Sequence, residues 1–591
     1  MKILLCAVNA KYIHSNPGII DLKTYAQAQT RKDDTEIETA AYTINQLRED
    51  ILKDIYLRKP DVLIFSCYIW NISMIRMIAS DFHNLLPSVP IWAGGPEVSY
   101  ECEKTLEQNS WLFGIMAGEG EAIFHLLVSH YEGLQPIESI PQLIYRREGK
   151  IISQYGNPPA FSLSDLPSPA SQIHPEDHKI YYYESSRGCP FSCSYCLSSV
   201  DKHLRFRDIE LVKKDLDTFL EARIPQVKFI DRTFNCRREH ALAIWRYIAE
   251  HDNGVTNFHF EIAADLLDDE MLDLFSQMRP GLIQLEIGVQ TTNPQTMKAI
   301  HRHAEFAKIA KNVQYIHTFR NIHQHLDLIA GLPFENYESF GHSFDDVFSL
   351  KPDQLQLGFL KVLKGSFMYD HKDEYDLVYS SEPPYEVLKT KWISYEDILK
   401  LKGIEDAVER YYNSLQFTAS LPWIMKFFDR PFVFFEELAS YLENLPEAGK
   451  NRQVLYERLL DFANKKRPGA TPLLRQLLTF DIYLREAAKT RPVFAQDQTP
   501  YHEVLSLTAH DLWKKSGTSI SFKQFLHETH QEMFSFDPKA LLEKGEVIEG
   551  HFICHFDYQN RDPLSHNAHI HILYGAYPSV VWAEESSDRF S

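Results

Sequence analysis

The sequence has little cysteine, little basic charge and no long apolar run, and each shortage excludes a class of protein. Eight cysteines in 591 residues are too few for a disulfide scaffold, so we expect a reducing, cytoplasmic location. The 61 basic residues are outnumbered by 81 acidic ones, and the formal charge of −20 disfavours general binding to nucleic acid or to an anionic membrane. No apolar run approaches the roughly 18 residues of a membrane helix.

The first part of the chain alternates short apolar runs with amphipathic stretches. Over residues 1–135 this pattern predicts an α/β, doubly wound, Rossmann-like domain with a parallel sheet and helices on both faces. Its strands are expected at 2–8, 61–66, 90–93 and 113–117. Residues 136–179 are punctuated by prolines and are predicted to be a linker.

A second alternating region covers residues 180–365. Its strand candidates start about 25–45 residues apart, as βα units do, and predict a partial (β/α)6 barrel with its chemistry on the loops after the strands. These strands are expected at 180–185, 226–230, 257–262, 282–288, 325–330 and 354–360. Residues 366–591 are dominated by long helical patterns, so we expect a mostly α-helical C-terminal domain that ends in strand-like segments.

Three of the cysteines follow the first predicted barrel strand. Cys189, Cys193 and Cys196 have the spacing C-x3-C-x2-C. Thiolates are the soft ligands that iron–sulfur clusters select, and a short loop can supply three corners of one cubane. The fourth iron then keeps an open position, as a catalytic metal requires. The alternatives are a structural zinc site, with His203 or Cys236 as fourth ligand, or inert buried cysteines.

The cysteine segment resembles the signature of the radical S-adenosylmethionine superfamily, C-x3-C-x-aromatic-C, with Tyr195 as the aromatic residue. The resemblance covers about residues 180–365, and segments 288–302, 326–333 and 356–365 are similar to later strand elements of that family. It implies a [4Fe–4S] cluster, S-adenosylmethionine chelated to the fourth iron, and formation of a 5′-deoxyadenosyl radical. It also implies an external electron donor such as flavodoxin or ferredoxin.

The resemblance also assigns candidate contacts to S-adenosylmethionine. The family's common Gly-Gly-Glu after the second strand is replaced here by Asp231-Arg232-Thr233. Asp231 or Thr233 could accept the hydrogen bond of the methionine amino group, or could cap the next helix. The candidate contacts are Tyr195, Asp231, Glu261, Glu286, Gln290 and Arg302. The charged members of this set could instead form structural ion pairs.

The first domain resembles the cobalamin-binding domain of one radical S-adenosylmethionine subclass. The resemblance rests on an ordered set of strand ends at 61–66, 93–99 and 117–121, directly upstream of the cysteines. Glycines at strand ends let the backbone approach a bulky ligand, and amides there can meet a phosphate or amide tail. The candidate cobalamin contacts are Ser66, Gly94, Gly95, Glu97, Gly118, Glu119 and Gly120.

The corrinoid motif Asp-x-His-x-x-Gly is missing from this domain. Asp81 and His83 match its start, but Leu86 replaces the glycine and the segment is predicted to be helical. His14, after the first strand, is a possible cobalt ligand or an ordinary loop histidine, and we expect that the cobalt lacks a protein imidazole. The competing interpretation is a flavodoxin-like module that has lost its corrin site.

The C-terminal region is dense in aromatic residues, which at helical spacing are core residues or the lining of an apolar pocket. His566, His569 and His571 are a metal cluster or solvated strand residues. We know this tail only as a family domain of unknown function.

Together these features predict a cobalamin-dependent radical S-adenosylmethionine enzyme that methylates an unreactive centre of an unknown substrate. We expect the two cofactors to meet at one shared cavity. Two other interpretations remain open. One is a cyclase or rearrangement enzyme with the same cofactors, and the other is a non-enzymatic corrinoid or redox sensor.

Overall fold

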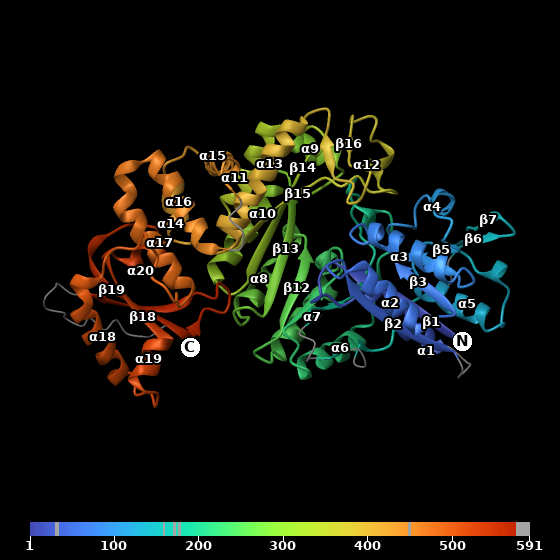
Figure 1. Cartoon of the computed structure of the whole chain (residues 1–591), viewed down its shortest axis with the longest axis horizontal. Helices are drawn as coiled ribbons and strands as arrows, with labels where there is room; N and C mark the ends of the chain where they lie inside the picture. The colour runs from blue at the N-terminus through green and yellow to red at the C-terminus, as the bar shows by residue number, and fades with distance from the viewer. Residues whose placement is uncertain (30–34, 158–159, 170–172, 175–178, 447–450, 575–591) are drawn as a thin grey trace. The chain divides into compact units, whose positions relative to one another are not determined.

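The structure is a computed structural model that describes residues 1–29, 35–157, 160–169, 173–174, 179–446 and 451–574 (Figure 1). The chain forms two compact units. The first contains Met1–Ser339 and Gly358–Tyr395, and the second contains Phe340–Leu357 and the chain from Glu396 onward. The predicted boundary at 365/366 therefore needs correction, because the segment up to Tyr395 packs with the first unit.

The first unit begins with a seven-stranded sheet in the order β2-β1-β3-β4-β5-β6-β7. The first five strands pair in parallel, and the last two add an antiparallel hairpin to β5. The strands are β1 (Lys2–Asn9), β2 (Glu36–Thr43), β3 (Val62–Ser66), β4 (Ile91–Gly94), β5 (Gly114–Met116), β6 (Leu143–Arg147) and β7 (Lys150–Gln154).

Helices cover both faces of this sheet, as the sequence predicted. The apolar cluster on one face includes residues of α2, α3 and α4, and the cluster on the other includes residues of α1 and α5. The helices are α1 (Pro17–Gln29), α2 (Arg48–Arg58), α3 (Ile72–Leu85), α4 (Cys102–Gln108) and α5 (Glu121–Tyr131). The doubly wound architecture is confirmed.

Three strands of this sheet were not predicted. Strand β2 pairs with β1 alone, so its mixed polar and apolar pattern is that of a sheet edge. Strands β6 and β7 lie inside the predicted linker, and Gly149, with φ +76°, makes the tight turn between them. The linker expected at 136–179 is thus corrected, because its first part belongs to the sheet.

The barrel half of the unit is an open six-stranded sheet in the order β8-β11-β12-β13-β14-β15. All of the predicted barrel strands are present, and the parallel arrows of its central strands are visible in Figure 1. The strands are β8 (Tyr181–Tyr183), β11 (Gln226–Phe229), β12 (Asn257–Ile262), β13 (Ile283–Gln290), β14 (His323–Ala330) and β15 (Gln354–Phe359). The intervening helices are α6 (Ile209–Glu221), α7 (Arg238–Glu250), α8 (Asp269–Ser276), α9 (Pro294–Ala299) and α10 (Phe306–Phe319).

After the barrel, a short helix and a small antiparallel sheet complete the first unit: α12 (Phe367–Asp370), β16 (Val378–Tyr379) and β17 (Val387–Lys389). The second unit is mostly helical, as predicted, and adds a three-stranded antiparallel sheet. Its helices are α11 (Tyr337–Phe348), which starts in the first unit, α13 (Tyr395–Val408), α14 (Ser420–Met425), α15 (Pro431–Glu443), α16 (Arg452–Lys466), α17 (Thr471–Arg485), α18 (His502–Lys515), α19 (Phe522–Glu528) and α20 (Pro538–Lys544). Its strands are β18 (Thr529–Phe536), β19 (Glu549–Arg561) and β20 (Ala568–Tyr574).

Many aromatic residues of the second unit are core residues. Phe432, Phe434 and Phe435 are each at most 1% exposed, and the rings of Phe428 and Phe462 stack 5.8 Å apart. In the part of the chain that the structure describes, no three or more His, Cys, Asp and Glu side chains converge on a metal position, so the tail histidines form no such cluster there.

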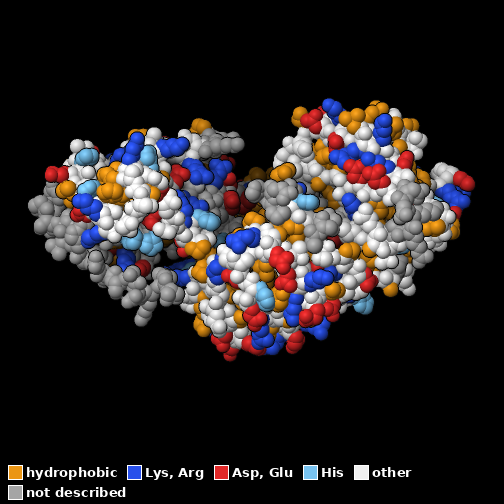
Figure 2. Space-filling model, turned by 90° about the horizontal axis from the view of Figure 1, so that it is seen from below, with side chains coloured by type: hydrophobic (Ala, Val, Ile, Leu, Met, Phe, Trp, Pro, Cys, Tyr) orange, Lys and Arg blue, Asp and Glu red, His pale blue; other side chains and the backbone are white. Residues whose placement is uncertain are grey.

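The described residues also bear on membrane-spanning helices and on the distribution of surface charge. No helix among them has the length and apolarity needed to cross a bilayer. On the face drawn in Figure 2, acidic and basic side chains are interspersed over the described surface.

Candidate functional site

The cysteine loop is closed at its base by a short antiparallel pair. Strand β9 (Ser186–Arg187) enters the loop and β10 (Arg205–Phe206) leaves it, with Arg205 opposite Arg187. Gly188 has φ +93°, and a Cβ atom there would collide with the carbonyl oxygen of His203. Only glycine fits this position, which lets the two ends of the cysteine loop approach each other closely just before Cys189.

The three cysteines line one cavity of about 250 Å³ in the first unit. Cys189 and Cys193 are each 8% exposed, and Cys196 is half-buried. The Nη1 atom of Arg302 donates to Cys193 Sγ at 3.6 Å. A cation beside a sulfur stabilises its thiolate form, which is the form that binds iron.

The zinc alternative gains no support. Among the described residues, no set of three or more possible ligands is arranged for a single metal ion, and this includes His203 and Cys236. Three thiols spread around a shared cavity fit a larger cluster with one open corner, and the residues present therefore fit a [4Fe–4S] group.

Polar residues from the barrel strands also line this cavity. Glu261 and Glu286 come from adjacent strands and lie in register with each other. Glu286 Oε2 lies 2.9 Å from Lys228 Nζ and 3.0 Å from His259 Nε2. Burial alone would raise the pKa of Glu286, but the hydrogen bond from His259 and the charge of Lys228 bring it well below its usual range.

Glu261 is the less compensated of the two carboxylates. Its Oε1 lies 3.8 Å from the Lys228 ammonium, which sits closer to Glu286. Burial, together with the charge of Glu286, raises the pKa of Glu261 to about 7. A carboxylate in this state gains from a cationic partner in the cavity.

Gln290 offers an unfilled acceptor at the same wall. Its Oε1 atom is buried and has no hydrogen-bond partner among the described residues. Its backbone has φ +74°, and its side-chain amide packs so closely over Gly288 that a Cβ atom on Gly288 would collide with it. A buried acceptor without a partner is costly, so this carbonyl fits the N–H or O–H group of a bound ligand.

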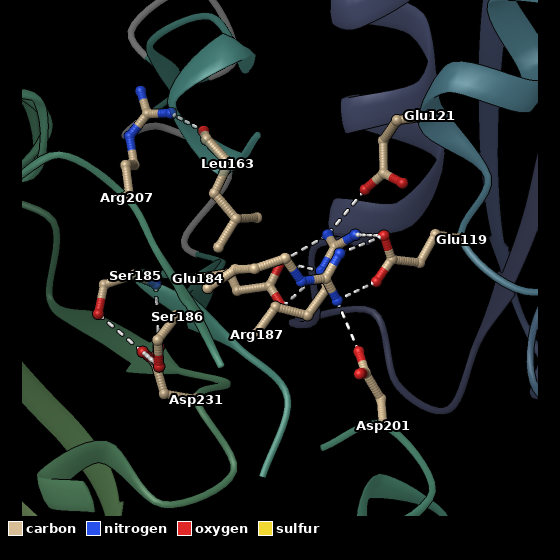
Figure 3. Close-up of polar contacts among 11 residues, drawn as sticks. Glu119, Glu121, Leu163, Glu184, Ser185, Ser186, Arg187, Asp201, Arg207 and Asp231 are labelled. Atoms are coloured by element: carbon tan, nitrogen blue, oxygen red, sulfur yellow. Dashed lines mark hydrogen bonds and ion pairs between the residues drawn. The ribbon is translucent and has the colours of Figure 1, made fainter. Parts of the chain in front are cut away.

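Asp231 lies apart from the cavity lining. Its carboxylate accepts hydrogen bonds from Ser185 N at 3.0 Å, Ser185 Oγ at 2.7 Å and Ser186 Oγ at 2.5 Å (Figure 3). Burial raises its pKa to about 6 despite these donors. Asp231 thus ties the end of β11 to the entry of the cysteine loop, and its neighbours Arg232 and Thr233 line the cavity instead.

A second cavity, of about 420 Å³, lies at the carboxyl ends of β3, β4 and β5. Its lining includes six of the seven predicted cobalamin contacts: Ser66, Gly94, Gly95, Gly118, Glu119 and Gly120. Gly95 has φ +106°, and a Cβ there would lie 2.5 Å from the carbonyl oxygen of Cys67. The glycine loops therefore bring bare backbone to a cavity wall, which fits a bulky ligand.

Glu97, the seventh predicted contact, does not line this cavity. It is 7% exposed and accepts a hydrogen bond from the hydroxyl of Tyr385. The lining also contains residues that the sequence did not single out, among them Gly18, Leu22, Tyr68 and Tyr100. Tyr68 and Tyr100 come shortly after the ends of β3 and β4, and that position was the signal available for them, whereas Gly18 and Leu22 lie on α1.

His14 faces the barrel. Its Nδ1 lies 2.6 Å from the hydroxyl of Tyr182, and the cavity lining does not include it. Asp81 and His83 lie on α3, as predicted. Within the described parts of the chain, no histidine lines the second cavity.

The two cavities share the lining residues Ser198 and Arg232. Charged pairs link the same two regions (Figure 3). Arg205 holds Glu119 through both carboxylate oxygens, and Arg187 Nη2 lies 2.7 Å from Glu121 Oε1. Burial alone would raise the pKa of Glu119, but the hydrogen bonds and charges of Arg205 and Arg187 hold it below its usual range. Glu119 is thereby occupied by arginine from the barrel side.

Three family descriptions match successive parts of the chain. Residues 5–128 match "B12 binding domain", residues 183–347 match "Radical SAM superfamily", and residues 373–553 match "Protein of unknown function (DUF4080)".

Known proteins with similar sequence or structure agree with these matches. The chain is 25% identical over 344 residues to the cobalamin-dependent radical SAM methyltransferase TokK of Streptomyces tokunonensis, covering 54% of this chain and 49% of TokK. It is 20% identical over 329 residues to the anaerobic magnesium-protoporphyrin IX monomethyl ester cyclase of Rubrivivax gelatinosus, covering 52% of this chain and 58% of the cyclase. The chain thus spans about half the length of these two relatives.

Among solved structures, the cobalamin-dependent S-adenosylmethionine radical enzyme OxsB, with aqua-cobalamin and S-adenosylmethionine bound, matches with a TM-score of 0.57. The match has 14% identity and covers 89% of this chain and 84% of OxsB, so it supports the fold. The resemblance seen in the sequence is confirmed at the level of domains: the chain carries a B12-binding, a radical SAM and a DUF4080 domain, and it is similar to cobalamin-dependent radical SAM proteins.

Proposed function

We propose that this chain is a cobalamin-dependent radical S-adenosylmethionine enzyme that methylates an unreactive centre of its substrate. The observation that carries the proposal is the pair of adjoining cavities, one walled by the three cysteines and the other by the glycine loops, with Ser198 and Arg232 in both walls. A methyl donor must come within about 3–4 Å of its target, so cofactors that act on one substrate need adjoining sites.

In this proposal Cys189, Cys193 and Cys196 hold the [4Fe–4S] cluster. When bound, the cluster supplies the electron that cleaves S-adenosylmethionine, and the corrin carries the methyl group. Arg302 donates to Cys193 Sγ and favours negative charge on that sulfur. Burial of Cys189 and Cys193 keeps water away from the sulfurs.

The barrel wall orients S-adenosylmethionine in this proposal. Gln290 Oε1 accepts a hydrogen bond from the ligand, because it lacks any other donor among the described residues. Glu261 faces the cationic methionine portion, because Lys228 compensates it incompletely. Tyr195, Glu286 and Arg302 line the same cavity, and contact between Asp231 and the ligand stays a prediction.

The glycine loops hold cobalamin in this proposal. A cavity of about 420 Å³ with bare backbone at Gly95 and Gly118 argues against a flavodoxin-like module that has lost its ligand site. The cobalt is expected to lack a protein imidazole, because no histidine among the described residues lines this cavity. A reducing cytoplasm and an external electron donor such as flavodoxin or ferredoxin complete the proposal.

The similarity to a cyclase keeps a second enzymatic function in play, in which the same cofactors close or rearrange a ring. Product analysis separates the two. The protein, reconstituted anaerobically with cluster and hydroxocobalamin, is incubated with S-adenosylmethionine, a reductant and an extract of the source organism. Methylation by a radical route gives a product heavier by one methyl group, with S-adenosylhomocysteine and 5′-deoxyadenosine in equal amounts.

Other product patterns contradict the proposal in distinct ways. 5′-Deoxyadenosine without S-adenosylhomocysteine indicates cyclisation or rearrangement. S-adenosylhomocysteine alone indicates methyl transfer by a polar route. No turnover of S-adenosylmethionine with any extract indicates a sensor.

A further inference from the structure

A segment directly after the barrel contacts both cofactor loops. We call residues 364–385 the brace and residues 94–101 the glycine loop. The brace lies in the first unit, with the barrel and the B12-binding domain. The DUF4080 match begins at residue 373, so the brace contains the first part of that domain.

Some residues of the glycine loop line the second cavity, and others contact the brace. Ser99 and Tyr100 line the second cavity, whereas Glu97 and Glu101 do not. The hydroxyl of Tyr385 donates to Glu97 Oε1, and these side chains are only 5% and 7% exposed. Their contact is therefore a buried hydrogen bond to a carboxylate, a strong type of contact.

Two further contacts hold the far end of the glycine loop. The hydroxyl of Tyr369 donates to Glu101 Oε1 at 3.2 Å, and Lys364 Nζ lies 4.0 Å from Glu101 Oε2. The ammonium of Lys364 also lies 5.6 Å from the centre of the Tyr385 ring. The brace thus contacts both carboxylates of the glycine loop, Glu97 and Glu101.

Gly365 brings the brace backbone against a residue of the cavity wall. A Cβ atom at this position would collide with the ring of Tyr100. Tyr100 also lines the second cavity, so the position of the brace backbone limits where a ring of the cavity wall can lie.

The other side of the brace contacts the cysteine loop. Met368 N donates to the carbonyl oxygen of Ser194 at 2.9 Å, and Ser194 stands between Cys193 and Tyr195. The ring of Phe367 meets that of His301 at 4.7 Å, next to Arg302. One short segment therefore touches the loops of both cavities.

We propose that the brace fixes the glycine loop relative to the cysteine loop and so sets how the corrin stands against the cluster. Tyr385 is its main positioning residue, and this part of DUF4080 serves the cofactor site directly. The inference rests on the proposed function, because it assumes that both cofactors bind. It differs from that function in assigning a role to a segment outside both cofactor domains.

The test compares full-length Tyr385→Phe and Tyr369→Phe with Tyr379→Phe. Tyr379 lies in the same segment and is half-buried, but its hydroxyl forms no hydrogen bond with another described residue, so it is the matched control. Iron per chain, the dissociation constant for hydroxocobalamin and the magnetic coupling between reduced cluster and cobalt(II) are measured without substrate. Loss of a hydrogen bond to a carboxylate is expected to weaken corrin binding about ten-fold in Tyr385→Phe.

We expect Tyr369→Phe to bind hydroxocobalamin about three-fold more weakly, since its hydrogen bond is longer and more exposed. The iron content should be unchanged in all variants. The coupling should change in Tyr385→Phe and stay native in Tyr379→Phe. Native corrin affinity and native coupling in both Tyr385→Phe and Tyr369→Phe would contradict the proposed role of the brace. If Tyr385→Phe fails to fold, Tyr369→Phe decides alone. Failure of the native protein to retain corrin would instead overturn the proposed function, and the brace with it.

Discussion

Arg187 lies two residues before the first cysteine of the loop, and its Nη2 atom lies 2.7 Å from Oε1 of Glu121 at the start of α5. The side chains are 18% and 9% exposed, so this is a largely buried ion pair. Glu184 holds the same guanidinium at 2.7 Å, and Glu119 approaches it at 3.5 Å. The guanidinium of Arg187, at the entry of the cysteine loop, thus lies beside three carboxylates that line the second cavity (Figure 3).

Replacing this arginine should destabilise the whole first unit. In Arg187→Ala, Glu121 and Glu184 remain buried without their cation, and breaking a buried pair costs about 3–5 kcal/mol in free energy of unfolding. Denaturant unfolding of the cofactor-free protein measures the loss. The matched control is Arg147→Ala, which removes a pair with Glu138 at roughly half exposure, where the expected loss is under about 1 kcal/mol. Equal losses in the two variants would contradict a special role for Arg187.

The cysteine assignment has its own internal control. Changing Cys189, Cys193 and Cys196 together to Ala should abolish the cluster, whereas native protein should bind about four iron and four sulfide per chain after anaerobic reconstitution. Burial, and after it the charge of nearby Cys189, raises the pKa of Cys236 to about 11. Cys236 is half-buried and does not line the cavity. Cys236→Ala should keep its iron, as measured by iron and sulfide assay. Retention of a four-iron cluster by the triple variant would overturn the assignment.

The sequence predicted the layout of this molecule far better than its individual contacts. All the barrel strands and the glycine loops could be found, because buried parallel strands are short apolar runs with glycine at their ends. Strand β2 escaped, because a sheet edge tolerates polar residues on one face. The hairpin β6–β7 was not predicted, because it joins the sheet antiparallel to β5 and so lies outside the alternation of strands and helices on which the prediction rested.

Side-chain partners could not be read from spacing. Glu97 and Glu119 follow glycines at strand ends, as ligand contacts do, but Tyr385 and Arg205 occupy them. These partners lie 288 and 86 residues away along the chain, so no local pattern reveals them. Asp231 is likewise held by serines 45 and 46 residues earlier.

Substitutions at Gly95 and Gly118, two of the glycines that line the second cavity, should have different effects. At Gly118 a Cβ meets nothing within 4 Å, so Gly118→Ala places a methyl group in open space at the cavity wall, with strain from φ +80° as its main cost to folding. At Gly95 a Cβ meets the backbone of Cys67 at 2.5 Å, so the loop itself must shift. Gly118→Ala should therefore fold and bind hydroxocobalamin more weakly, whereas Gly95→Ala should lose both stability and corrin.

Gel filtration with corrin absorbance and thermal unfolding separate the two effects. Gly149→Ala is the control, because it has φ +76° and equally open space but lies in the β6–β7 turn, away from the cavity. Its strain should lower the melting temperature as Gly118→Ala does, with native corrin binding. Native corrin affinity in Gly118→Ala would contradict the placement of the ligand.

We expect Glu261 to make both stability and the affinity for S-adenosylmethionine depend on pH, in opposite directions. Its pKa of about 7 lies above the ordinary 4.5, so the carboxyl prefers to be protonated in the folded chain. Its contribution to stability is therefore fully present below pH 4.5 and is lost as the pH rises through about 7. Affinity for S-adenosylmethionine should rise over the same interval, because only the ionised carboxylate attracts the cationic ligand.

Glu261→Gln separates this residue from every other titrating group, including the amino group of the ligand. The amide is neutral at all pH values, so the variant should lose the part of both pH profiles that belongs to Glu261. Equilibrium binding of S-adenosylmethionine to the cluster-loaded protein at pH 6 and pH 8, and denaturant unfolding of the ligand-free protein at the same pH values, provide the comparison. If native protein and Glu261→Gln gain affinity equally between pH 6 and pH 8, this carboxylate does not face the cationic part of the ligand.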